Sequence, residues 1–193
     1  MPEGCALVTG ASRGIGAAIA KALAADGWPV GVNYRSDKDA AEKVVAEIES
    51  DGGKAVAIAA DVADPGAAEE LFKSIESHFD APVLVLVNNA GIARDDLTPS
   101  LDDDQWSAVI ETDLTAAFRL TRRALKSMMR ARSGRIVNIS SVVALRANPA
   151  SVVRRARPRP APGAVSPPMS CRGWRSRRRP SLDRGRVGRQ ARA

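Results

Sequence analysis

Residues 9–16 read TGASRGIG and stand between an apolar run at 6–9 and a stretch of helical periodicity that ends near Ala25. Gly10, Gly14 and Gly16 have no Cβ, so the backbone there can turn sharply and approach a phosphate group closely. The N-terminus of the helix that follows offers unpaired N–H groups and the positive end of its dipole to an anion. The segment therefore predicts a strand, a phosphate-binding turn and a helix in succession.

The chain beyond this turn alternates strand-like and helix-like segments as far as residue 140. The expected strands cover residues 29–34, 55–60, 83–87 and 135–140, and the expected helices cover residues 37–50, 64–79 and 101–132. In the last helix, Trp106, Leu114 and Ala117 are among the apolar positions that share one helical register. Strands joined by helices of this length form right-handed crossovers and a parallel sheet covered on both faces. We predict an α/β fold, a Rossmann-like doubly wound parallel sheet of five strands.

The positive charge of the chain is concentrated in its C-terminal part. Residues 1–150 carry 16 Lys and Arg against 21 Asp and Glu, a net charge of −5, whereas residues 151–193 carry 13 Arg and one acidic residue, Asp183. The same segment holds six prolines and no sustained period of 2 or 3.6 residues. We predict a nucleotide-binding domain over residues 1–150 and a disordered Arg/Pro-rich tail over residues 151–193.

The basic tail, the cysteines and the histidine each suggest a further kind of partner or site. A basic tail can bind nucleic acid by counterion release, but its one aromatic residue, Trp174, provides no repeated stacking pattern, so we do not expect a nucleic-acid partner. Cys5 and Cys171 do not have the spacing of a disulfide framework or a metal site, and His78 has no second ligand at suitable spacing. With no apolar run of membrane-spanning length, we expect a cytoplasmic protein without a metal or a membrane partner.

Four segments carry a resemblance to a known family: TGASRGIG, DVAD at 61–64, NNAG at 88–91 and GRIVNISS at 134–141. Over residues 4–149 the sequence resembles the short-chain dehydrogenase/reductase family, of the 3-oxoacyl-(acyl-carrier-protein) reductase type. The resemblance implies that residues 1–150 are an incomplete NAD(P)-binding domain with five of the family's seven strands. It also implies three sets of coenzyme-binding residues: Gly10, Ser12, Arg13, Gly14, Ile15 and Gly16 for the phosphates, Asp61 and Val62 for the adenine edge, and Asn88, Ala90 and Gly91 for the ribose and nicotinamide side.

The residue after the second expected strand indicates which coenzyme is bound. An NAD enzyme usually places an acidic residue there for the ribose 2′-hydroxyl, whereas a 2′-phosphate needs cationic donors. This chain has Arg35 there, with Ser36 beside it and Arg13 in the glycine turn. We predict NADP(H), the alternative being that Arg35 is only a solvated surface residue.

The resemblance implies a reaction centre that this chain only partly contains. Ser141 matches the serine that holds the substrate carbonyl, with Ser140 as the weaker candidate, and Asp113 stands where the family has an asparagine. The family's tyrosine and lysine would follow Ser141, but the only tyrosine is Tyr34 and the last lysine is Lys126. Arginines in that stretch are poor acids at ordinary pH. By resemblance we expect an NADPH-dependent reductase of 3-oxoacyl thioesters, of the fatty-acid or polyketide type. Because the tyrosine and lysine are absent, we expect this chain to be catalytically defective as written. The alternative is a non-catalytic NADP(H)-binding remnant.

The composition changes near residue 150, where the resemblance to the family ends. We interpret the C-terminal part as frameshifted or truncated. The resemblance implies an acyl thioester substrate, carried on an acyl-carrier protein. Family helices that build the homodimer or homotetramer are missing from this chain, so we do not expect that oligomer to form, and we expect the apolar side of the 101–132 helix to lack partners.

Overall fold

The computed structural model describes residues 3–94 and 100–141 of the 193-residue chain. The expected domain boundary at residue 150 and the expected disordered tail, residues 151–193, lie outside the described residues. The fold is therefore given for the part of the chain that contains all five expected strands.

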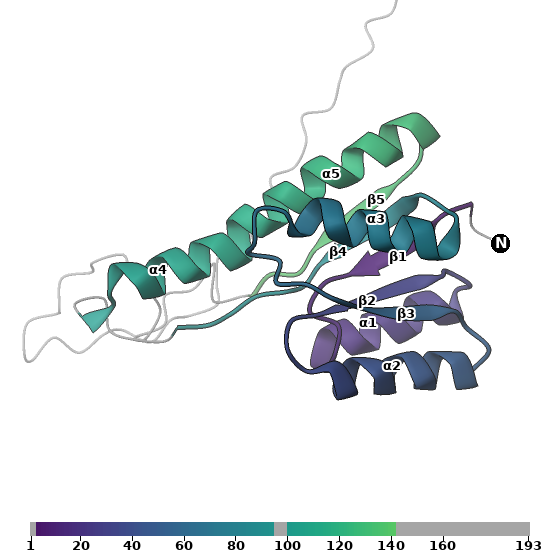
Figure 1. Cartoon of the computed structure of the whole chain (residues 1–193), viewed down its shortest axis with the longest axis horizontal. Helices are drawn as coiled ribbons and strands as arrows, with labels where there is room; N and C mark the ends of the chain where they lie inside the picture. Colours follow the sequence, from purple (N-terminus) through teal and green to yellow (C-terminus); the bar gives the residue numbers. More distant parts are fainter. Residues whose placement is uncertain (1–2, 95–99, 142–193) are drawn as a thin grey trace, which may run out of the picture. The chain divides into compact units, whose positions relative to one another are not determined.

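A single sheet of five parallel strands forms the centre of the described structure (Figure 1). The strands follow the order β3-β2-β1-β4-β5. Their bounds are β1 (Cys5–Val8), β2 (Val30–Tyr34), β3 (Ala55–Ala59), β4 (Val83–Asn88) and β5 (Arg135–Asn138). Every neighbouring pair is parallel, which confirms the predicted Rossmann-like, doubly wound α/β fold.

Two helical layers cover the sheet, because successive residues of each strand face opposite sides. Ala6 and Val8 of β1 pack into the cluster under α1 (Gly14–Ala25) and α2 (Lys38–Ser50). Cys5 and Leu7 of the same strand pack into the cluster under α3 (Ala67–Phe79) and α5 (Ala116–Ala131). Figure 1 shows these helix pairs on opposite faces of the sheet. Strands buried on both faces explain the nearly uninterrupted apolar runs of the sequence.

The helical stretch after residue 100 is not the single α-helix that the sequence predicted. It consists of α4 (Asp103–Val109), a π-helical segment η2 (Ile110–Thr115) and α5 in direct succession. Asp102 and Gln105 form a capping box at its start, since each side chain bonds the backbone N–H of the other. A π-helical turn holds more residues than an α-helical turn, so the faces of α4 and α5 are offset around the helix axis.

The apolar side chains of this helical stretch divide into an exposed set and a buried set. Trp106 and Leu114, which the sequence pattern placed in one helical register, are 46% and 63% exposed. Beyond η2 the buried side chains of α5 repeat every four residues, as expected for one helix face. They are Ala116, Leu120, Ala124 and Met128.

The strand order fixes where a ligand can enter. The chain leaves β1 toward β2 on one side, while β4 pairs with β1 on the other side. Loops that leave the carboxyl ends of β1 and β4 therefore diverge, and the crevice between them is the usual ligand site of an open parallel sheet. The glycine turn at 9–16 and the NNAG segment at 88–91 both lie at this edge.

Candidate functional site

The glycine turn is a compact loop that packs directly against the segment after β4. Gly10 has a φ of +60°, a conformation that glycine adopts without strain, and a Cβ built on it would lie 2.9 Å from Ala90 Cα. A Cβ on Gly16 would lie 2.5 Å from both Asn89 Nδ2 and the Gly10 carbonyl oxygen. The turn can hold this shape only because these two positions lack side chains.

The first turn of α1 has N–H groups available for a ligand. The helix begins at Gly14, and Arg13, at its N-cap, makes no side-chain hydrogen bond to the helix. The first N–H groups of an α-helix have no partner within the helix, and the dipole adds positive potential there. Gly14 and Ile15 are exposed at this end, whereas Gly16 is buried against the turn. This arrangement favours binding of a phosphate group.

Thr9 and Asn89 join the glycine turn to the end of β4. The Thr9 hydroxyl accepts the backbone N–H groups of Asn89 and Ala90, both at 3.0 Å, and donates to the Val87 carbonyl at 3.2 Å. In return, Asn89 Nδ2 donates to the carbonyl oxygens of Thr9 at 2.9 Å and Gly10 at 3.0 Å. Sequence reasoning assigned neither side chain a role, although both belong to quoted motifs.

Asn33, a third residue that sequence reasoning missed, is buried in β2. Its Oδ1 accepts the Gly10 N–H at 3.2 Å, and its Nδ2 donates to the Ala60 carbonyl at 3.0 Å. The side chain thus holds the glycine turn against the segment that leaves β3. The available signal was a polar residue in the otherwise apolar strand VGVNY.

One cavity at this edge, here called the Arg35 cavity, has a volume of about 420 Å³. Most of the predicted coenzyme-binding residues line it, and they come from four loops. They are Gly10, Ser12, Arg13, Arg35, Asp61, Val62, Ala90 and Gly91.

The charged groups of the Arg35 cavity sit at the ends of β2 and β3. Arg35 Nη1 lies 3.9 Å from Asp61 Oδ2, and the Arg35 side chain is 61% exposed. The other Asp61 oxygen accepts the Ala63 N–H at 3.0 Å. The guanidinium is therefore open to a ligand that carries a negative charge.

A second cavity of about 480 Å³, here called the Asp113 cavity, lies on the other side of the NNAG segment. Its walls come from β4, η2, α5 and the end of β5, and it shares lining residues with the Arg35 cavity. The shared residues are Val62, Asn89, Ala90, Gly91 and Thr112. The two cavities therefore meet around the NNAG segment.

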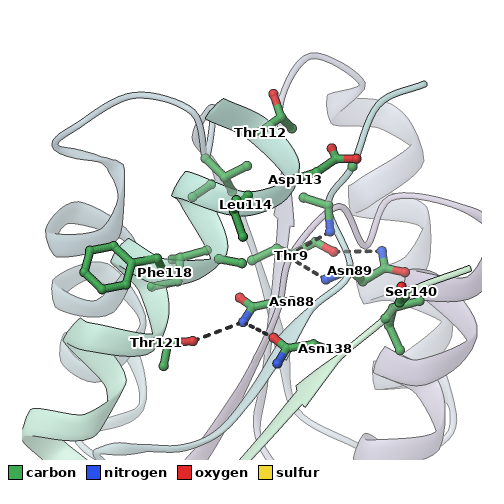
Figure 2. A pocket seen from close by; sticks show the side chains of 17 residues that line it. Thr9, Asn88, Asn89, Thr112, Asp113, Leu114, Phe118, Thr121, Asn138 and Ser140 are labelled. Atoms are coloured by element: carbon green, nitrogen blue, oxygen red, sulfur yellow. Dashed lines mark hydrogen bonds between the residues drawn. The ribbon is translucent and has the colours of Figure 1, made fainter. Parts of the chain in front are cut away.

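Asn88 lies at the floor of the Asp113 cavity with its amide turned toward β5 and α5 (Figure 2). Its Nδ2 donates to Asn138 Oδ1 at 2.8 Å and to Thr121 Oγ1 at 3.4 Å. The side chain is buried and links two strands and a helix. Its predicted contact with a ribose stays a prediction.

Asp113 and the two serines lie around the same cavity. Asp113 Oδ1 accepts the N–H of Ile92 at 2.9 Å, so the carboxylate fixes the backbone just after NNAG. Ser140 lines the cavity, and Figure 2 shows it across from Asp113. Ser141 is exposed at the end of the described segment and has an interaction partner. Its predicted role as the carbonyl-holding serine stays a prediction.

Within residues 3–94 and 100–141, His, Cys, Asp and Glu side chains form no group of three or more that could hold a metal ion. In the same part of the chain, every helix is too short or too polar to cross a bilayer.

Known proteins similar to this chain align with most of its length. The family described as short chain dehydrogenase matches residues 4–154. A 3-oxoacyl-[acyl-carrier-protein] reductase of Synechocystis is 49% identical over 144 residues, and a reductase of the same name, FabG, from Staphylococcus aureus is 47% identical over 144 residues. Each alignment covers 75% of this chain but 58% of the relative. The chain thus spans less than two thirds of the length of these curated relatives.

Two solved structures share the fold. One is a putative gluconate dehydrogenase from Agrobacterium tumefaciens, with a TM-score of 0.71 and 37% identity over 76% of this chain and 57% of that one. The other is a short chain dehydrogenase from Burkholderia cenocepacia in complex with NADP, with a TM-score of 0.69 and 41% identity over 77% of this chain and 59% of that one.

Proposed function

This chain belongs to the short chain dehydrogenase family, and from that premise we propose that its described residues form the NADP(H)-binding half of a 3-oxoacyl thioester reductase. One observation carries the proposal: a glycine turn that would not tolerate a Cβ at Gly10 or Gly16 lies beside a guanidinium at the end of β2. A pyrophosphate needs the close backbone approach that the glycine turn allows, and a 2′-phosphate needs the cationic guanidinium of Arg35. The related structure that contains NADP supports the choice of coenzyme.

Each part of the coenzyme has a set of residues suited to it. The N–H groups at the start of α1, with Ser12 and Arg13, would hold the pyrophosphate. Arg35, aided by Arg13 and Ser36, would pair with the 2′-phosphate. Asp61 and Val62 would line the adenine, and the NNAG residues Asn88, Ala90 and Gly91 would line the ribose and nicotinamide.

The Asp113 cavity is the proposed place for the substrate carbonyl. When bound, NADPH supplies hydride to a carbonyl carbon, and the protein must hold the oxygen and supply a proton to it. Ser141, with Ser140 beside it, is the proposed group that holds the oxygen. Asp113 already accepts a backbone N–H, and as a carboxylate it has no amide donor to offer.

We expect this chain, as its sequence stands, to bind coenzyme without reducing a carbonyl at an appreciable rate. Its one tyrosine, Tyr34, is buried at the end of β2 and lines the Arg35 cavity, on the proposed 2′-phosphate side. The sequence after Ser141 offers arginines, which remain protonated and do not act as acids at neutral pH. A proton donor for the developing alkoxide is thus lacking among the residues assigned to the site.

The proposed substrate and surroundings follow from the relatives named above. We propose an acyl thioester on an acyl-carrier protein as the substrate class. We propose that the protein acts in the cytoplasm. We also propose that this chain does not form the family's dimer or tetramer.

Titration of the full chain with each coenzyme tests the proposal. Calorimetry or nicotinamide fluorescence should give an affinity for NADPH at least about tenfold tighter than for NADH, because only NADPH carries the phosphate for Arg35. Tighter binding of NADH would reject the coenzyme assignment. In the same samples, acetoacetyl thioester should cause negligible NADPH oxidation; turnover of about 1 s⁻¹ or more, the lower end for typical enzymes, would reject the predicted defect.

A further inference from the structure

Arg119 of α5 reaches across the helical layer to the loop that follows β3. Its Nη1 donates to the carbonyl oxygen of Ala63 at 3.0 Å and to Glu111 Oε2 at 3.0 Å. The Arg119 side chain is 23% exposed, so the contact is partly shielded from water. Glu111 belongs to the π-helical segment η2, which places its carboxylate where it can hold the guanidinium.

The loop residue that Arg119 holds is bonded on its other side to a residue of the coenzyme cavity. Asp61 Oδ1 accepts the N–H of Ala63 at 3.0 Å, while Arg119 binds the carbonyl of the same residue. Asp61 Oδ2 in turn faces Arg35 at 3.9 Å. One chain of contacts therefore runs from Glu111 through Arg119, Ala63 and Asp61 to Arg35.

Arg119 itself does not line the Arg35 cavity, whereas Asp61 and Val62 do. Among the described residues, its contact to Ala63 is the side-chain hydrogen bond that joins α5 to this loop. The loop then turns back on itself, with the Asp64 N–H bonded to the Asp61 carbonyl at 3.1 Å. A segment held at one point by an outside donor can shift as a unit when that donor is removed.

We propose that Arg119 is a positioning residue for coenzyme binding: it fixes the loop at 61–64 so that Asp61 and Val62 form the adenosine wall of the Arg35 cavity. The inference rests on the proposed function, because it assigns the adenosine half of the coenzyme to that wall. It adds a residue of α5, 56 positions away in sequence from Ala63.

The test compares three variants of the full chain. Arg119→Met keeps most of the apolar stem and removes both hydrogen bonds, whereas Arg119→Lys keeps a cation that can donate to both acceptors. Arg122→Met is the matched control, because Arg122 lies on the same helix and its guanidinium stacks over Phe118 at 5.3 Å, away from the loop. Binding of 2′,5′-ADP, the adenosine fragment of NADP, is measured by calorimetry, and exchange of the backbone amides of residues 61–66 by mass spectrometry without ligand.

We expect Arg119→Met to bind 2′,5′-ADP about tenfold more weakly or worse, since small misplacement of binding groups is costly. Exchange at residues 61–66 should become faster in this variant. Arg119→Lys should restore affinity to within about threefold of wild type, and Arg122→Met should match wild type in both measurements.

Other outcomes would overturn the inference. Unchanged affinity in a folded Arg119→Met chain would do so, as would equal losses in Arg119→Met and Arg122→Met. If Arg119→Met does not fold, Glu111→Ala decides, because it removes the acceptor that holds the guanidinium. This variant must weaken binding of 2′,5′-ADP and speed exchange at 61–66, and no change in either would overturn the inference. Failure of the wild-type chain to bind 2′,5′-ADP would instead overturn the proposed function, and this inference with it.

Discussion

The guanidinium of Arg35, at the end of β2, lies 3.9 Å from the carboxylate of Asp61, at the end of β3. Both groups are partly exposed, and an ion pair of this kind contributes about 0–1 kcal/mol to stability. The pair therefore has little effect on folding. The pair does hold a cation at the proposed 2′-phosphate site, where NAD and NADP would differ.

Replacement of Arg35 by Gln should change coenzyme preference without loss of the fold. We expect NADPH affinity to fall about tenfold, close to 1.4 kcal/mol, while NADH affinity stays nearly constant. Titration with both coenzymes measures this. Lys38→Gln is the control, since Lys38 is an exposed cation near Arg35 that pairs with Glu42. An equal change for both coenzymes would argue against a 2′-phosphate site at Arg35.

Gly16→Ala should disrupt the glycine turn. The new Cβ would meet Asn89 Nδ2 and the Gly10 carbonyl at 2.5 Å, so the turn must move away from β4. We expect a loss of stability of about 1–3 kcal/mol, as for other overpacked sites, and at least tenfold weaker NADPH binding. Chemical denaturation and titration provide the two values.

Gly66→Ala is the matched control for that change. A Cβ there would contact only Glu70 Oε1, at 3.8 Å, which is an ordinary distance. Similar losses in Gly66→Ala and Gly16→Ala would show that the close approach to Asn89 is not what makes glycine necessary.

Thr9→Val should destabilise the protein although it preserves the shape of the side chain. The N–H groups of Asn89 and Ala90 would lose their shared acceptor in a buried place. We expect a cost of about 1–3 kcal/mol in the free energy of unfolding, measured by urea denaturation. Thr115→Val makes the same exchange at a half-buried position of η2 and should cost less. Equal costs would contradict the proposed importance of Thr9.

The fold could be predicted from the sequence because its signals are local. Each strand is a short apolar run, and each helix has a repeating apolar face that ends near a glycine or a polar turn. TGASRGIG and NNAG also predicted correctly that the loops after β1 and β4 would meet at one edge. The alternation of strands and helices along the sequence predicted a parallel sheet.

The details that the sequence did not predict depend on contacts between distant segments. The bonds of Thr9, Asn33 and Asn89 exist only once three strands lie side by side, so no local pattern announces them. The π-helical turn at 110–115 also interrupts a sequence that reads as one α-helix. As a result, the apolar positions before and after this turn do not follow one α-helical register.

Cys5 offers a test of burial at the start of β1. Desolvation by burial, and secondarily the charge of Glu76, raises the pKa of the Cys5 thiol to about 12 from 9.0. The pKa of Cys5 is higher in the folded state than in the unfolded state. The contribution of the neutral thiol to the free energy of unfolding is therefore fully present below pH 9.0 and is lost as the pH rises toward about 12.

Iodoacetamide labelling measures this effect in a chain that also carries Cys171→Ser. At pH 9, alkylation of Cys5 should be at least about 100-fold slower in the native protein than in urea, since only the thiolate reacts. Equal rates would show that the thiol is not held in a buried, neutral state.

An apolar stripe formed by Leu114, Phe118, Leu125 and Met129 is exposed along η2 and α5. Exposed apolar patches promote association, so the chain should have low solubility. Phe118→Gln with Met129→Gln should raise the concentration at which light scattering detects aggregates. Ile15→Gln, which removes an exposed apolar side chain at the other helical layer, should raise it less. An equal gain would show that the stripe has no special part in aggregation.

The central place of β1 has a consequence for synthesis on the ribosome. This strand emerges first, and β2 can pair with one of its edges soon afterward, but the opposite edge pairs with β4. That edge, over Cys5–Val8, remains open until Val83–Asn88 has left the exit tunnel. A nascent chain that stalls before that point exposes unpaired backbone on an apolar strand, which is the kind of surface that chaperones must protect.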